Sequence, residues 1–152
     1  MAVFRYKMQN VLNIKLQLEN QANMEYGMKL AKLREEEDKM QVLQDKKQAY
    51  IDKGLELLTG ILDTLEIAAN KASVIKMDEY IGLQQEAIEE AEDQVELARR
   101  KLTMAMQERK IHERLRENAL EAFLQEEKEK EKKEIDELTS FTYGQKAQEE
   151  VE

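Results

Sequence analysis

The chain has 152 residues, a formal net charge of −9, and no proline, cysteine or tryptophan. Charged residues make up 38% of it and aromatic residues 5%, a composition typical of long helices and poor in the bulk that a compact core requires. The lack of cysteine excludes disulfides, thiolate zinc sites and thiol catalysis. The acidic balance disfavours nucleic-acid binding, and no apolar run is long enough for a signal peptide or for membrane insertion. We therefore expect a cytoplasmic helical protein.

The first predicted helix covers residues 2 to 58. Its apolar side chains recur at intervals of three and four residues, or sums of these, which keeps them on one face of a helix. This face comprises Phe4, Met8, Val11, Leu18, Ala22, Tyr26, Leu30, Leu33, Met40, Leu43 and Tyr50.

The chain is expected to reverse direction near its middle. Gly54, Thr59 and Gly60 weaken the helix there, and we place a short helical or looped tip at residues 59 to 73. Asn70 could stop one helix in a left-handed conformation, and Ser73 could cap the next.

The second predicted helix covers residues 74 to 139, and its apolar positions follow a 3-4 alternation. The alternation runs through positions 77, 81, 84, 88, 91, 95, 98, 102, 105, 109, 112, 116, 119 and 123. Polar side chains interrupt it at Gln84, Arg109, His112 and Arg116, where the neighbouring Ile111, Leu115 and Leu120 could replace them in the packed face. Residues 140 to 152 are polar and contain Gly144, which predicts a disordered tail.

These patterns predict an all-α fold in which residues 1 to 152 form a single coiled-coil unit. Two arms of similar length favour an antiparallel hairpin, an elongated rod that is a monomer in isolation. The alternative is a continuous helix that dimerises in parallel, since two glycines cost a helix only about 1 kcal/mol each relative to alanine.

The sequence offers little material for catalysis. Its single histidine, His112, cannot form a histidine pair, and the five glycines form no phosphate-binding loop. The carboxylate runs at residues 35–38 and 89–90 are typical of the solvated face of a helix. We therefore expect no enzymatic activity, no cofactor and no metal site, and function through docking.

The order of several short motifs resembles the flagellar export protein FliJ family over nearly the whole chain. The chain opens with an aromatic-x-aromatic-x-Met-x-x-Val-Leu pattern, where the family more often has leucine at the methionine position. The residues that carry the resemblance are Phe4, Tyr6, Met8, Val11, Leu12, Lys15, Glu19, Ala22, Tyr50, Met77, Tyr80, Ile81, Leu83, Ala87, Ile88, Ala98, Arg99, Lys101, Leu102, Asp136 and Glu137.

This resemblance implies a non-enzymatic component of the flagellar type III protein export apparatus, and so a role in flagellum biogenesis and motility. Such proteins are similar to the central stalk of rotary ATPases. Their paired ends dock in the hexameric ring of the export ATPase and promote its assembly and activity. They also contact the cytoplasmic domain of the membrane export gate and the export chaperones, which implies a cytoplasmic protein peripherally associated with the membrane-bound apparatus.

The resemblance also assigns residues to two docking surfaces. The first, which we call the terminal surface, would dock in the ATPase ring and comprises Phe4, Tyr6, Met8, Val11, Leu12, Phe123 and Leu124. The second, the midchain surface, would contact the export gate and comprises Tyr80, Leu83, Gln84, Ala87 and Ala91. Packing within the coiled coil is the competing interpretation for both sets.

Two other functions fit the same sequence. A holdase-type chaperone could grip unfolded clients through the adaptable side chains of Met24, Met28, Met40, Met104 and Met106. A purely structural coiled-coil scaffold needs no docking surface. The sequence also leaves open whether the system is flagellar or a related virulence secretion system.

Overall fold

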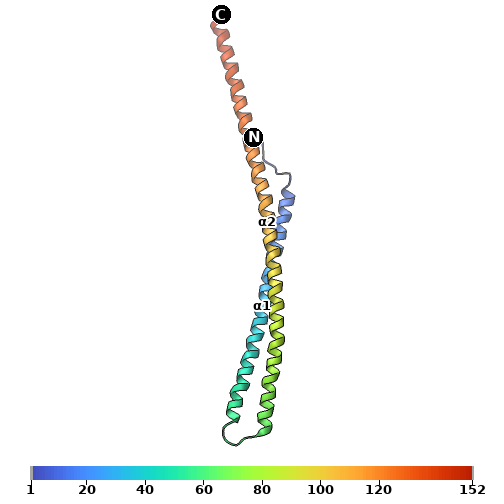
Figure 1. Cartoon of the computed structure of the whole chain (residues 1–152). Coiled ribbons are helices and arrows are strands. Elements are labelled where there is room, and N and C mark those ends of the chain that lie inside the picture. The colour runs from blue at the N-terminus through green and yellow to red at the C-terminus, as the bar shows by residue number, and fades with distance from the viewer. Residues whose placement is uncertain (1, 152) are drawn as a thin grey trace. The chain divides into compact units, whose positions relative to one another are not determined.

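The computed structural model describes residues 2–151, and within this range it contains two helices and no strand. Helix α1 comprises Gln9–Leu57 and helix α2 comprises Thr64–Val151 (Figure 1). The two helices pack against each other, which confirms the predicted all-α hairpin. The chain divides into two compact units, which we describe separately. The terminal unit contains the residues up to Leu18 and from Met106 onward, and the loop unit is Glu19–Ala105.

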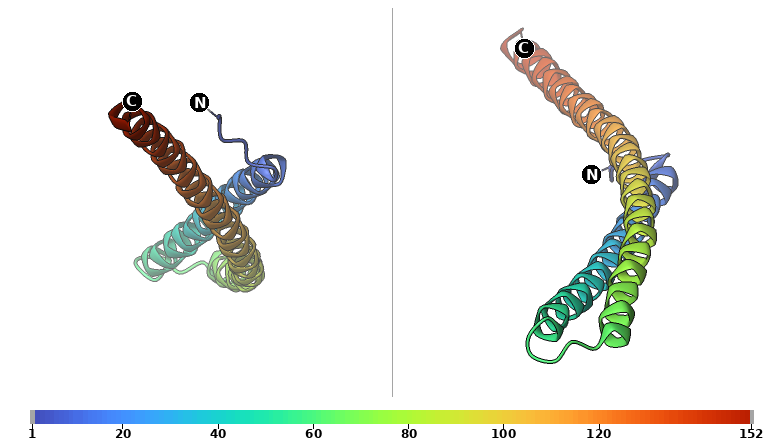
Figure 2. Two further views of the ribbon diagram at one scale, coloured as in Figure 1. Left: turned by 90° about the horizontal axis from the view of Figure 1, so that it is seen from above. Right: turned by 60° about the horizontal axis from the view of Figure 1, so that its bottom comes forward.

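The loop that joins the helices is shorter than expected and lies in the loop unit (Figure 2). Helix α2 begins at Thr64 because Asp63 caps it: its Oδ1 accepts hydrogen bonds from the backbone N–H groups of Leu65 at 3.0 Å and Glu66 at 3.4 Å. The expected tip at residues 59 to 73 is thus corrected to residues 58–63. Asn70 and Ser73, expected to stop and cap helices, both lie inside α2.

Helix α1 ends through two local features. The Thr59 hydroxyl donates a hydrogen bond to the Glu56 carbonyl at 2.7 Å, which satisfies one of the last backbone acceptors. Gly60 then has a φ of 76°, a left-handed conformation that side chains other than glycine rarely adopt. The chain can therefore turn directly after the helix.

Close to this loop, α1 and α2 approach each other at Gly54. Asn70 of α2 donates a hydrogen bond from Nδ2 to the Tyr50 carbonyl of α1 at 2.9 Å. A Cβ atom at position 54 would lie 2.6 Å from Asn70 Oδ1, so the bare glycine backbone makes room for this amide. Ser73 has a simpler environment, since its hydroxyl donates to the Ala69 carbonyl one turn earlier in α2.

The predicted packed face of α2 is confirmed. All fourteen positions of the alternation from 77 to 123 are buried or half-buried, including the four polar ones. Ile111 and Leu115 do not replace the polar residues in the packed face, since they are 59% and 49% exposed. Leu120 is half-buried, as expected. Arg109, His112 and Arg116 stay in the face because their long or flat side chains can bury apolar atoms while the polar end reaches the edge.

Both ends of the chain differ from expectation in the described residues. Residues 2–8 precede α1, whose first backbone hydrogen bonds run from Gln9 N to Tyr6 O and from Leu12 N to Met8 O. No serine, threonine, aspartate or asparagine precedes Gln9 to cap an earlier start. Residues 140 to 151, which we expected to form a disordered tail, continue α2 as far as Val151. Residue 152, the last of the expected tail, lies outside the described residues. Thr139 and Thr142 bond back to carbonyls four residues earlier in α2.

Candidate functional site

The terminal surface lies within the terminal unit, and the structure brings its two halves together. The rings of Phe4 and Phe123 lie 5.4 Å apart between centroids, tilted by 50°. The Arg116 guanidinium lies 5.7 Å from the Phe4 centroid, within reach of a cation–π interaction. The irregular segment before α1 is therefore held against α2 by an aromatic pair rather than by helical hydrogen bonds.

The members of the terminal surface differ in accessibility. Leu12 is only 4% exposed, so it stabilises this end by packing and offers no free side chain. Met8 and Leu124 are 49% and 57% exposed and can contact a partner directly. Phe4, Tyr6, Val11 and Phe123 are half-buried.

Polar contacts fix the register of the same unit. Lys15 of α1 pairs with Glu108 of α2 at 2.8 Å, and this hydrogen-bonded ammonium lowers the pKa of the Glu108 carboxyl. Arg116 donates from Nε to Gln9 Oε1 at 3.0 Å. Both contacts join α1 to α2, so they hold the N-terminal segment at one position along α2.

The midchain surface lies in the loop unit, and its five residues do not form one exposed patch. Tyr80 and Leu83 are 43% and 63% exposed, and the Lys76 ammonium lies 5.5 Å from the Tyr80 ring centroid. Gln84 and Ala87 are half-buried, and Ala91 is buried at 8% exposure. Only Tyr80 and Leu83 therefore present large apolar side chains to a partner.

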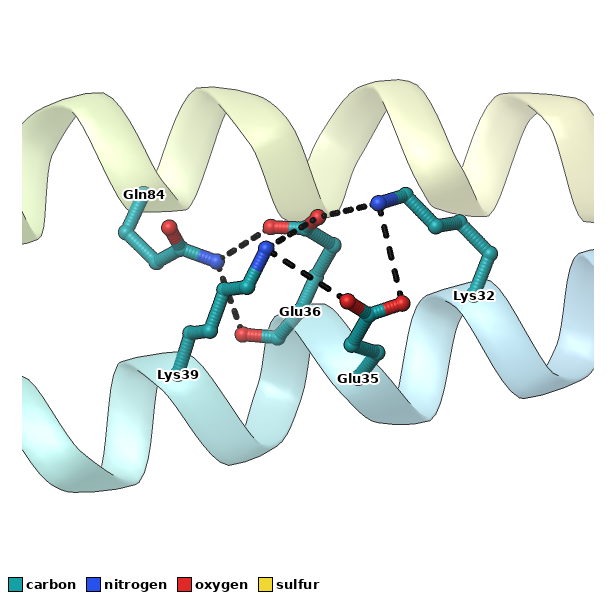
Figure 3. A network of polar contacts seen from close by, with 5 residues as sticks. All are labelled: Lys32, Glu35, Glu36, Lys39 and Gln84. Carbon is teal, nitrogen blue, oxygen red and sulfur yellow. Dashed lines mark hydrogen bonds and ion pairs between the residues drawn. The ribbon is translucent and has the colours of Figure 1, made fainter.

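Gln84 is part of a polar network between the helices (Figure 3). Its side-chain amide donates to the backbone carbonyl of Glu36 at 2.8 Å and to Glu36 Oε2 at 2.6 Å. Glu36, on α1, is only 7% exposed, and Lys32 and Lys39 of the same helix approach its other carboxylate oxygen at 3.0 and 3.4 Å. A buried carboxylate is stable in this position because every neighbouring group that reaches it donates a hydrogen bond or carries positive charge.

The same contacts change the acidity of Glu36. The hydrogen bond from Lys32, followed by the one from Gln84, lowers the pKa of Glu36 from 4.5 to about 2, against the opposing effect of burial. Glu36 is therefore charged at neutral pH.

Two depressions flank this network. One is a groove of about 460 Å³ lined by Glu35, Asp38, Lys39, Val42, Leu43 and Gln84. The other, of about 360 Å³, is lined by Lys29, Lys32, Glu36, Ala87, Glu90, Ala91 and Gln94. The sequence-based prediction placed the midchain surface on the second helix alone and did not indicate that Gln84 lines a groove together with residues of α1. The sequence feature that could have indicated this groove is Val42, an apolar residue that lies beside the packed Leu43 but outside the 3-4 pattern.

Comparison with known proteins identifies the family. The sequence profile of the flagellar FliJ protein family matches residues 4–148. The chain belongs to this family. The fold is similar to that of a solved structure from Chlamydia trachomatis, CT670, described as a candidate YscO homolog, with a TM-score of 0.72 and 22% identity over 96% of this chain and 99% of that one. No curated protein matches the chain.

Membership of the FliJ family makes this chain a component of a type III export apparatus, in a family of non-enzymatic accessory proteins. Between residues 2 and 151, no three histidine, aspartate or glutamate side chains are grouped closely enough to hold a metal ion. Neither helix of the described part has a stretch apolar and long enough to cross a bilayer.

Proposed function

We propose that this FliJ family member is a coiled-coil stalk that docks through its terminal surface in the ring of the export ATPase and promotes the assembly and activity of that ring. The observation that carries the proposal is the contact of the N-terminal segment with α2 at the Phe4–Phe123 pair, with Met8 and Leu124 left exposed. A stalk needs its two strands held together where they enter a ring, together with apolar side chains free to contact the ring.

The proposal gives the midchain surface a second role, contact with the cytoplasmic domain of the membrane export gate. Tyr80 and Leu83 support it, because both are large, apolar and exposed within one turn of α2. Binding of export chaperones and peripheral association with the membrane-bound apparatus belong to the same proposal.

The test of ring docking is ATP hydrolysis by the purified cognate export ATPase, with and without this protein at less than one copy per ring. Met8→Asp and Leu124→Asp are the informative substitutions, because both side chains are exposed and a charge there should not unfold the chain. We expect stimulation by the parent and its loss in the double variant. Leu138→Asp, at a residue 66% exposed and outside the terminal surface, is the matched control and should stimulate normally.

Gate contact is tested by titrating the purified cytoplasmic domain of the gate with the parent protein and with Tyr80→Ala. We expect about tenfold weaker binding, as for loss of one aromatic anchor worth about 1.4 kcal/mol. Tyr143→Ala removes a more exposed tyrosine of the same helix, 74% against 43%, and should leave binding unchanged. Equal affinity of parent and Tyr80→Ala would remove Tyr80 from this contact.

Holdase activity is the second candidate, because Met24, Met28 and Met104 are 69%, 71% and 63% exposed. A holdase should suppress the aggregation of unrelated unfolded proteins without stimulating the ATPase. Stimulation by the parent without suppression of aggregation supports the stalk, and the reverse result supports the holdase.

A further inference from the structure

The groove beside Gln84 has an apolar floor to which α1 contributes most. Val42 is 52% exposed and Leu43 is half-buried, and both line the groove of about 460 Å³. The amide of Gln84 is directed to Glu36, as Figure 3 shows, so the polar end of this side chain is already satisfied. An apolar group entering here would cover Val42 and Leu43 without leaving the Gln84 amide unpaired.

The rim of the groove has an uncompensated negative charge. Glu35 lies 3.7 Å from both Lys32 and Lys39, so its carboxylate is shared by two ammonium groups. Among the described residues, no side chain forms a hydrogen bond or an ion pair with the carboxylate of Asp38. A cationic group beside the occupant would therefore find a free carboxylate at Asp38.

We propose that this groove receives a large apolar side chain of the export gate's cytoplasmic domain, and that a lysine or arginine next to that side chain pairs with Asp38. The inference rests on the proposed gate contact and extends the midchain surface from α2 onto α1. Its grounds are the carboxylate of Asp38 at the rim, which is complementary to a cationic side chain, and the continuity with Gln84, which belongs to both the groove and the midchain surface. A pocketed apolar anchor with a charged neighbour is the usual composition of a binding hot spot.

The experiment is a titration of the purified gate domain with the full-length protein and four variants. Val42→Ser removes the apolar floor and Asp38→Lys reverses the rim charge. Met28→Ser and Glu37→Lys are matched controls, since Met28 is an exposed apolar residue and Glu37 an exposed acidic residue of α1, and neither lines the groove. We expect each groove variant to bind about tenfold more weakly, and each control to stay within about twofold of the parent.

The outcomes separate this inference from the proposed function. Absence of binding by the folded parent would overturn the gate contact and the groove with it. Tight binding by the parent and equally tight binding by Val42→Ser and Asp38→Lys would overturn the groove alone. Equal weakening by Glu37→Lys and Asp38→Lys would show general charge attraction and overturn the pairing with Asp38. A change of mass with Asp38→Lys in light scattering, with gate binding unaltered, would make a second copy the occupant and likewise overturn the proposal.

Discussion

The loop unit and the terminal unit pack α1 against α2 with different kinds of residue. In the loop unit, Ile88, Ala91 and Ala98 are 3–8% exposed, and small alanines allow the facing backbone to come near. Among the described residues of the terminal unit, Leu12 is the single buried apolar residue. Positions 109, 112 and 116 of the packed face carry arginine, histidine and arginine there.

The difference shows two ways of placing polar groups between helices. Arginine has a long stem, so Arg116 can lie along the packed face and reach Gln9 and the Phe4 ring at its edge. Glutamate is shorter, and the buried Glu36 is stabilised by Gln84, which donates to it from the opposite helix, and by Lys32 and Lys39 of its own helix. Both contacts join α1 to α2 at one register, but only the buried carboxylate depends on its partners for its stability.

The largest expected effect is in the terminal unit, at its single buried apolar residue. Leu12→Ala should reduce the free energy of unfolding by about 2–5 kcal/mol, because it removes a packed side chain and leaves a cavity. Leu18→Ala, at a residue 43% exposed in the same unit, should cost less than about 1 kcal/mol. Urea unfolding followed by circular dichroism measures both. Equal costs would mean that the terminal unit has no packed core at Leu12.

The loop unit should respond to added rather than to removed volume. Ala98→Leu should cost about 1–3 kcal/mol, because Ala98 is 3% exposed and a larger side chain would push α1 and α2 apart. Ala31→Leu, at an exposed position of α1, serves as the control and should be nearly neutral. Urea unfolding measures the free energy of unfolding of both variants. An unchanged value for Ala98→Leu would contradict close packing at this alanine.

The packed face of α2 could be predicted from sequence because it depends only on spacing within one helix. The start of α2 could have been predicted as well. Asp63 followed three residues later by Glu66 is a capping pattern, and Asp63 does cap the helix. Asn70 and Ser73 misled the prediction because both residue types favour helix ends, whereas here their side chains bond to the carbonyls of Tyr50 and Ala69.

The candidate surfaces were less accessible to sequence reasoning. Phe4 and Phe123 are far apart in the sequence, so spacing within one helix does not predict their contact, and only the resemblance to the family places them on one surface. The burial of Glu36 could not be predicted, since its partner Gln84 lies 48 residues away on the other helix. Leu12 and Ala91 were assigned to docking, but their exposure of 4% and 8% could be learned only from the packed structure.

Acid should reduce the stability of the fold through two carboxylates, Glu36 between the helices and Glu96 at the surface. The pKa values of Glu36 and Glu96 are both lowered from 4.5 to about 2, Glu36 first by Lys32 and then by Gln84, and Glu96 by Arg99 and then by Arg100. A carboxyl whose pKa is lowered by folding stabilises the protein above its unfolded value and loses that contribution on protonation. Stability should therefore fall between pH 4.5 and about 2, and fall less steeply in Glu36→Gln and in Glu96→Gln.

Salt should separate the two carboxylates in this experiment. The side chains of Glu96, Arg99 and Arg100 are 45–72% exposed, so about 1 M salt should remove most of the Glu96 contribution. The contribution of Glu36, whose side chain is 9% exposed, should persist. The measurement is the urea midpoint of parent and variants from pH 4.5 to 2, at low and at high salt. Equal screening of both would contradict the burial of Glu36.

The smallest expected effect concerns the close approach at Gly54. Gly54→Ala gains about 1 kcal/mol of helix propensity. The new Cβ would also lie 2.6 Å from Asn70 Oδ1, which displaces the Asn70 side chain from the Tyr50 carbonyl at a cost of about 1 kcal/mol. The two terms should nearly cancel, so the urea midpoint of the single variant should be close to that of the parent.

In an Asn70→Ala background the amide is already gone, and Gly54→Ala should then stabilise by about 1 kcal/mol. A four-member double-mutant cycle of urea midpoints measures this coupling. Additive effects would mean that the Asn70 side chain accommodates the new methyl group while keeping its hydrogen bond, and that the bare backbone at Gly54 is not what makes room for it.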